Sequence, residues 1–254
     1  MTGNGDGDKP ARTSPGKPAP VPLPKRFYSA VTVAPSDGGF AILLDGKPVR
    51  TPRKLPLAVP TRALAEAIAG EWSAQKDRVD PASMPLSKLA ITAIDGVASH
   101  LAEVASNIVQ FAGSDMLCYR AEEPEALAVL QAAAWDPILR WAEAELGARF
   151  ATVKGVMPVE QRPEALQRVA AAVAPFDAMA LTALHVMTTL TGSAILALAH
   201  AAGRISAEEA WTAAHVDEDW QISQWGIDVE AAERRVRRRA EMQAASRFLE
   251  LLRA

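Results

Sequence analysis

The amino-acid sequence predicts an α+β protein, with a small antiparallel β-rich N-terminal domain followed by a larger all-α C-terminal domain. Between residues 25 and 60, apolar and polar residues alternate and turn-forming residues interrupt the pattern, which is typical of strands. From residue 61 onward, apolar residues recur at helical spacing, and alanine is abundant in the second half. The chain has 254 residues, which suffices for two modest domains.

The β-rich domain, residues 25–60, should form a short antiparallel meander. Asp45-Gly46 is typical of a two-residue hairpin turn, because glycine tolerates a positive φ. Several prolines interrupt the region, and we expect them at edges or turns, since proline has no N–H to donate. A sheet this short must pack against another element to be stable. The expected strands are residues 27–33, 40–44, 48–51 and 55–59.

The helical domain should cover residues 61–254, with its boundary between residue 60 and about residue 85. Thr61 is a predicted N-cap, and Ser206 with Glu209 matches a capping box. Prolines at the first turn of two further helices fit the same interpretation. The expected helices are residues 61–72, 87–111, 124–135, 137–146, 162–173, 177–201, 206–225 and 228–254.

Residues 1–24 are predicted to be a disordered tail, because they are rich in proline and glycine and contain almost nothing apolar. They do not resemble a secretion signal, and Asp6 and Asp8 argue against a mitochondrial presequence, so we expect a cytoplasmic protein. The uncharged run 178–203 contains threonines and histidines, and it has no flanking tryptophan or tyrosine and no basic cluster to set an orientation. We therefore interpret it as a buried central helix and expect no membrane insertion.

Composition narrows the possible partners and cofactors. The 27 basic and 30 acidic residues give a formal net charge of -3, which argues against nucleic acid as the main partner. The one cysteine, Cys118, cannot form an internal disulfide or a multi-thiolate zinc site, which indicates a reducing compartment. Its neighbours are mostly large and apolar, so we expect a buried, inert thiol.

No pattern of catalytic residues stands out, and we expect no cofactor and no metal. His215 and Asp219 lie four residues apart, a spacing that two metal ligands can share on a helix, but no second histidine lies nearby. The arginine-rich run 234–239 is the one basic cluster. Because glutamates lie within one helical turn of it, we expect these arginines to pair with them inside their own helix.

A helix rich in tryptophan and acid is the most distinctive feature. Trp211, Trp220 and Trp225 accompany Gln221 and the acidic run 217–219. Most such tryptophans belong to a core, and the alternative is a partner-binding surface. Two other classes stay open: an enzyme with an acidic site around Asp217 and Glu218, assisted by His215, or a scaffold module that binds another protein through this helix.

Seven short segments stand out by their order and spacing. They are LLDGKPVRTP at 43–52, EWSAQ at 71–75, DP at 80–81 with MPL at 84–86, SDMLCYRA at 114–121, WDP at 135–137, GS at 192–193, and DEDWQ at 217–221 with WG at 225–226. Together they resemble the ATP synthase assembly chaperones that bind the α subunit of the catalytic sector. The resemblance covers about residues 26–253.

The resemblance implies a function without catalysis: holding the unassembled α subunit until it joins β, so that its interface does not aggregate. It also implies that Glu218 is the functionally sensitive acidic position and that Trp72 is a packing residue. We expect a monomer of bacterial type. The candidate partner-binding residues are Glu218, Asp217, Gln221 and Trp225, and the structural motif residues are Trp72, Gln75, Asp115 and Trp135.

Overall fold

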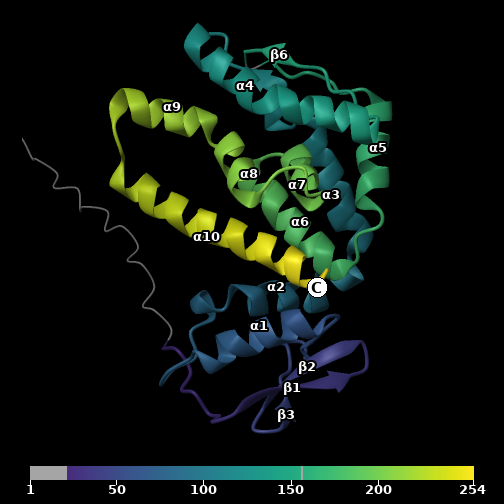
Figure 1. Cartoon of the computed structure of the whole chain (residues 1–254), viewed down its shortest axis with the longest axis vertical. Coiled ribbons are helices and arrows are strands. Elements are labelled where there is room, and N and C mark those ends of the chain that lie inside the picture. The colour runs from purple at the N-terminus through teal and green to yellow at the C-terminus, as the bar shows by residue number, and fades with distance from the viewer. Residues whose placement is uncertain (1–21, 156) are drawn as a thin grey trace, which may run out of the picture.

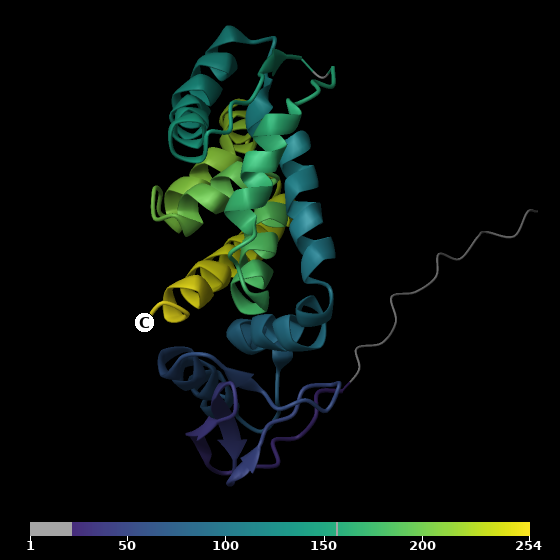
Figure 2. The same ribbon diagram turned by 90° about the vertical axis from the view of Figure 1, so that its right-hand side faces the viewer.

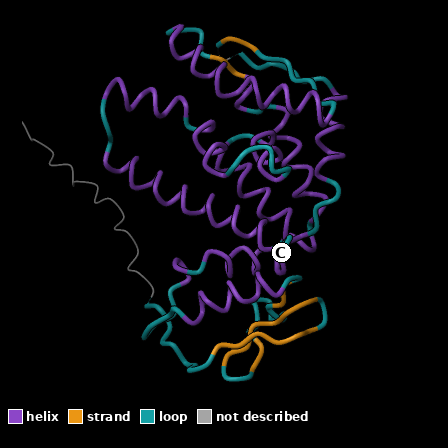
Figure 3. The backbone as a smooth tube through the Cα atoms, viewed as in Figure 1, coloured by secondary structure: helices purple, strands orange, loops and turns teal. Residues whose placement is uncertain are grey.

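A computed structural model describes residues 22–155 and 157–254 and shows a small sheet at one end of a helical body (Figures 1 and 2). The strands of this sheet precede the long helices in the chain, so the predicted α+β class and its order are confirmed (Figure 3). The predicted tail, residues 1–24, lies almost entirely outside the described residues.

The sheet consists of β1 (Val31–Ser36), β2 (Gly39–Leu44), β3 (Lys47–Pro48) and β4 (Ala58–Val59). β1 runs antiparallel to β2 with Val31 opposite Leu44, and β3 and β4 pair with opposite ends of β2. Asp45 and Gly46 have φ values of 48° and 78°, which confirms the tight hairpin turn. The first strand begins at residue 31 rather than at 27, because the preceding N–H groups of Ser29 and Ala30 donate to the Asp45 carboxylate.

The first helix, α1 (Arg62–Ser73), packs against β1 and β2 (Figure 1). The Thr61 hydroxyl accepts from Leu64 N at 3.2 Å, which confirms the predicted N-cap. Leu64 and Ile68 are fully buried, so the helix supplies the apolar face that the short sheet needs. The division into two domains stays a prediction, and the packing of α1 favours the later boundary, near residue 85.

The helical body consists of the helices that follow α1. They are α2 (Pro85–Asp95), α3 (Leu101–Gly113), α4 (Glu125–Trp141), α5 (Pro163–Val173), α6 (Ala178–Thr191), α7 (Ala194–Ala201), α8 (Ala207–Ala214), α9 (Val216–Trp225) and α10 (Val229–Leu251). The body is built around α6, which contacts α2, α3, α7 and α10. Most residues of α6 are buried, as predicted for a central helix, and no helix in the described part of the chain is long and apolar enough to cross a membrane.

Short elements connect these helices. Three single 3₁₀ turns and one π-helical turn occur in the described residues, together with a parallel strand pair that the sequence did not indicate. The turns are η1 (Pro81–Ser83), η2 (Val97–Ser99), η3 (Met116–Cys118) and η4 (Ala142–Leu146), and the strands are β5 (Tyr119–Arg120) and β6 (Val153–Lys154).

Three predicted helices are each divided in the structure. The segment 87–111 breaks near Gly96 into α2 and α3, and the segment 206–225 breaks at His215 into α8 and α9. The segment 177–201 ends its first half at Gly192, whose φ of 67° closes α6, and the Ser193 hydroxyl then caps α7 through Leu196 N. Helical periodicity continues across such breaks, so it predicted one helix where there are two.

At Pro137 the sequence predicts two helices where the structure has one. The proline is predicted to begin a new helix, but α4 runs continuously from residue 125 to 141 and includes it. A proline inside a helix costs about 3 kcal/mol. Trp135, Ile138 and Trp141 of α4 are all buried. Burial of each of these side chains contributes about 1.5–3 kcal/mol, so that together they offset the cost of the proline.

Candidate partner-binding site

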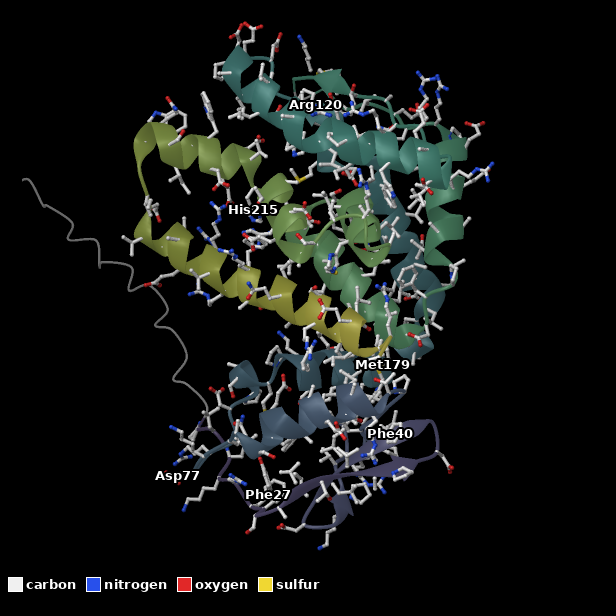
Figure 4. The ribbon with its side chains drawn as sticks, viewed as in Figure 1. Phe27, Phe40, Asp77, Arg120, Met179 and His215 are labelled. Atoms are coloured by element: carbon white, nitrogen blue, oxygen red, sulfur yellow. The ribbon has the colours of Figure 1, made fainter. Side chains whose placement is uncertain are left out.

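The corner between α8 and α9 is fixed by His215. Its ring stacks on Trp211 with the centroids 3.8 Å apart, and its Nδ1 lies 2.7 Å from the Trp211 carbonyl oxygen. Burial lowers the pKa of His215, so the ring is neutral at pH 7. Figure 4 shows this residue between the corner and α10. The histidine therefore sets the direction in which α9 leaves α8.

The three consecutive acidic residues of α9 face two different neighbours. Asp217 Oδ1 accepts from Gln131 Nε2 of α4 at 2.7 Å, and Gln131 is itself buried. Glu218 and Asp219 instead contact Arg235 of α10, at 3.9 and 2.5 Å. Asp217 thus anchors α9 to α4, whereas Glu218, with half of its side chain exposed, faces the gap toward α10.

The arginines of α10 do not pair as expected. Within the run 234–239, only Arg237 has a glutamate partner in its own helix among the described residues, at 4.0 Å. Arg235 contacts α9, Arg239 Nη2 lies 2.6 Å from Glu208 of α8, and Arg238 donates to the Leu190 carbonyl of α6. The prediction of intrahelical pairing is wrong for these three, because α10 crosses α6, α8 and α9 and meets their acceptors directly.

A groove of about 660 Å³ lies between α9 and α10. Glu218, Gln221 and Trp225 line it, whereas Asp217 does not. The structure therefore brings three of the four candidate residues to one concave surface. Its apolar lining consists of Trp211, Ile222, Trp225, Ile227, Ala231, Ala232 and Val236.

Four exposed apolar side chains lie at the end of α9, in the turn that follows it and on the first two turns of α10, and we refer to them as the apolar tip. They are Trp225, Ile227, Val229 and Val236, with exposed fractions of 78, 70, 72 and 69%. Trp211 is buried and Trp220 is half-buried, so the core interpretation fails for Trp225. Sequence reasoning missed the other three residues, although apolar residues at positions 227, 229 and 236 lie in an otherwise polar stretch, which was the available signal.

Trp72 and Gln75 lie far from this groove along the chain, where α1 ends. Tyr28 Oη donates to the Trp72 carbonyl at 2.7 Å, and the two rings lie 5.8 Å apart. Gln75 is buried: its amide donates to Ser83 Oγ, and its Oε1 accepts from Asp80 N at 2.7 Å. These contacts connect the end of α1 to Tyr28 and to the segment 80–83.

Asp115 and Trp135 join elements inside the helical body. Asp115 is fully buried and accepts from Leu117 N and, at the start of α7, from Ile195 N, each at 3.1 Å. Trp135 is also buried, and its Nε1 donates to the Ala213 carbonyl of α8 at 2.7 Å. The polar atoms of both residues therefore bind backbone groups of a segment that is distant in the chain.

Two other candidates for chemistry, the Cys118 thiol and the His215–Asp219 pair, have the following surroundings in the described residues. Cys118 is fully buried, and burial raises the pKa of its thiol to about 12, so the thiolate does not form at neutral pH. Asp219, the partner considered for His215 in a metal pair, contacts Arg235 instead. Across residues 22–155 and 157–254, no group of three or more His, Cys, Asp or Glu side chains is placed to hold a metal ion.

Comparison with known proteins gives a consistent result. A family model described as ATP12 chaperone protein matches residues 25–143. The mitochondrial protein atp12 of Schizosaccharomyces pombe is 23% identical over 230 residues, which are 84% of this chain and 78% of that protein.

Two solved structures share the fold over nearly the whole chain. Atp12 of Paracoccus denitrificans has 44% identity and a TM-score of 0.87, covering 90% of this chain and 98% of its own. The Atu1473 protein of Agrobacterium tumefaciens has 55% identity and a TM-score of 0.88, covering 91% and 87%.

Proposed function

This chain belongs to the ATP12 chaperone family, and from that premise we propose that it binds the unassembled α subunit of the F-type ATP synthase. Family membership supports a chaperone role in ATP synthase assembly. The bound chaperone would shield the α interface until β replaces it. We further propose that it acts without catalysis, as a monomer, in the cytoplasm.

The observation that best supports a binding role is the apolar tip beside the charged groove. Contiguous exposed apolar surface on a folded protein marks an interaction site, and tryptophan is enriched among the residues that contribute most to binding. An unassembled subunit also exposes apolar surface that its partner normally covers. Trp225 and Glu218 line the same groove, so one surface offers both an apolar contact and charged groups that orient a client.

A pull-down tests the identity of the client. The tagged full chain, expressed at native level in its host, should recover the free α subunit without β. If the bait is folded and α is not recovered, the client assignment is wrong, and a scaffold module with another partner, or an enzyme, becomes the better hypothesis.

We expect Glu218→Lys to keep the protein folded and to weaken binding of the α subunit by about 10-fold or more. Half of the Glu218 side chain is exposed, so the new lysine can reach solvent. The substitution removes one of the two carboxylates that contact Arg235 and places a second positive charge near this arginine. Binding is measured with purified proteins, and folding by circular dichroism.

Glu66→Lys is the matched control, because Glu66 is an exposed carboxylate that also contacts an arginine, Arg62, at 3.3 Å. It should bind α like the wild type. Unchanged binding by Glu218→Lys would contradict the placement of the client at this groove, while leaving the chaperone role in place.

A further inference from the structure

We infer that a short antiparallel ladder at the sheet end of the molecule is a second docking surface, which takes an acidic segment of the client in an extended conformation. The ladder pairs residues 24–28 with residues 77–79. Figure 4 shows Phe27 and Asp77 at this end, whereas His215, beside the groove, lies in the helical body. This inference rests on the proposed function, because the occupant is part of that client.

Two positive side chains lie directly opposite each other in this ladder. Lys25 and Arg78 form an isolated antiparallel bridge between two backbone hydrogen bonds of 2.9 Å. Opposite side chains are closest in a pair of this kind, and like charges placed there destabilise the pairing. A carboxylate bound beside Lys25 and Arg78 would lie near both charges and offset this repulsion.

The unpaired charge of this surface is positive. A hollow of about 570 Å³ beside the ladder is lined by Tyr28 and by five charged side chains, which are Lys25, Arg26, Lys76, Arg78 and Asp77. None of the five forms an ion pair within 4.0 Å among the described residues. The guanidinium groups of Arg26 and Arg78 donate to backbone carbonyls.

One further carboxylate, that of Asp45, lies near Arg26 but outside the hollow. Its pKa is lowered mainly by the N–H groups of Ala30 and Ser29, which donate to it, and also by the charges of Arg26 and Lys47. With Asp45 and Lys47 included, five basic groups face two acidic ones, so the surface as a whole complements an acidic segment.

An exposed aromatic ring accompanies these charges. Phe27 is 75% exposed, and its ring meets that of Tyr28 edge-on at 5.4 Å. Alternate residues of an extended segment lie on one face, so Phe27 shares a face with Lys25, while Tyr28 on the other face is buried. The surface therefore combines apolar contact area with positive charge, which suits a segment in which apolar and acidic residues alternate.

The ladder also has a free edge. Arg26 N donates to the Asp77 carbonyl, and in an antiparallel ladder the N–H groups of neighbouring residues point to opposite sides. The N–H groups of Lys25 and Phe27 therefore point away from residues 77–79, and neither makes a hydrogen bond among the described residues. An extended peptide can add to such an edge through backbone hydrogen bonds, and its side chains then contact those of the ladder.

Two other occupants fit less well. Residues 1–21 of this chain contain three basic and two acidic side chains, so they do not complement a basic surface. An anionic membrane would suit the lysines and Phe27, but it offers no strand for the free edge. The groove between α9 and α10 carries as many carboxylates as arginines and would meet a different part of the client, so Glu218→Lys tests a separate contact.

The experiment measures the affinity of the purified full chain for the purified α subunit of its host. Lys25→Glu combined with Arg78→Glu should weaken binding about 10-fold, and the effect should shrink at high salt, because screening weakens charge interactions. Phe27→Ser should weaken binding about 5-fold, because it removes the exposed ring.

Matched controls lie at exposed positions of α2 and α4. Lys88→Glu combined with Arg140→Glu makes the same change in net charge as the double variant, and Val129→Ser shortens another exposed apolar side chain. Both controls should bind α like the wild type.

A single substitution separates binding from stability. Lys25→Glu places a carboxylate opposite Arg78, so the melting temperature should equal or exceed that of the wild type, while the affinity for α falls about 3-fold. Hydrogen–deuterium exchange then locates the contact. In the wild type, exchange in a peptide covering residues 22–30 should slow when α binds, because an added strand protects the N–H groups of the free edge.

The outcomes separate this inference from the proposed function. If the wild type does not bind α, the proposed client is wrong and the inference falls with it. If the wild type binds α but the double variant binds equally well, or exchange in residues 22–30 does not slow, the client role stands and the inference is wrong.

Stronger binding by the double variant would show that the client segment is basic, which also overturns the inference. A last arm uses phosphatidylserine-containing vesicles. If the wild type co-sediments with them, the double variant does not, and α binding is unchanged, then the ladder contacts lipid and not the client.

Discussion

Replacement of Trp135 by alanine is expected to lower the free energy of unfolding by about 3–5 kcal/mol. The side chain is 1% exposed, and its removal leaves a large cavity between α4 and α8. It also leaves the Ala213 carbonyl, which accepts from Trp135 Nε1 at 2.7 Å, without this partner. Urea denaturation of the purified protein measures the loss.

Trp225→Ala is the matched control, because it removes the same side chain from an exposed position. It should change the free energy of unfolding by no more than about 0.5 kcal/mol. Trp135→Phe keeps most of the volume and should lose mainly the hydrogen bond, about 1–2 kcal/mol. If Trp135→Ala and Trp225→Ala lowered the free energy of unfolding equally, this would contradict the assignment of Trp135 to the core and of Trp225 to the surface.

Asp115→Ala is expected to cost about 3 kcal/mol or more, because it leaves several buried N–H groups without an acceptor. The carboxylate accepts from Leu117 N and Ile195 N, and also from the Ser193 hydroxyl. Ser193 and Ile195 lie at the start of α7 and Leu117 lies in η3, and all three are fully buried. Asp177→Ala, which removes the exposed N-cap of α6, should cost only about 1 kcal/mol by comparison.

The stabilisation by Asp115 should also depend on pH. Burial raises the pKa of this carboxyl to about 7 in the folded protein, against about 3.9 in an unfolded chain. Between these values the native state keeps a proton that the unfolded state has released, so stability falls as the pH rises. The difference in free energy of unfolding between the wild type and Asp115→Ala should therefore decrease from pH 5 to pH 7, by at most about 1.4 kcal/mol per pH unit. A difference that stays constant or increases would contradict the raised pKa.

We expect the Trp135, Asp115 and Glu218 variants to separate residues that stabilise the fold from residues that bind the client. Trp135 and Asp115 come from motifs whose polar atoms bind backbone groups of distant helices. Glu218 comes from a motif on α9 that faces the groove. Loss of client binding by a Trp135 variant would thus report unfolding, whereas loss by a Glu218 variant with intact structure would report the interface.

Several local features were predictable because the residues that create them are neighbours. The hairpin at Asp45-Gly46 follows from the positive φ that such a turn requires. The capping box at Ser206 is present because its hydroxyl and the Glu209 carboxylate reach each other's N–H groups within one turn. The central helix was recognisable because a long uncharged stretch with polar interruptions favours burial in protein.

The sequence by itself therefore determined the fold class, the caps and turns, and the identity of the helix that presents the acidic and aromatic residues. Only the tertiary structure decided that Asp217 anchors to Gln131, that Arg235 pairs with Asp219, and that Trp225 is exposed. The physical reason is how far apart in the sequence the interacting residues lie. A cap or hairpin depends on atoms a few residues apart, whereas these pairings depend on how helices cross, which is set by the packing of the whole core.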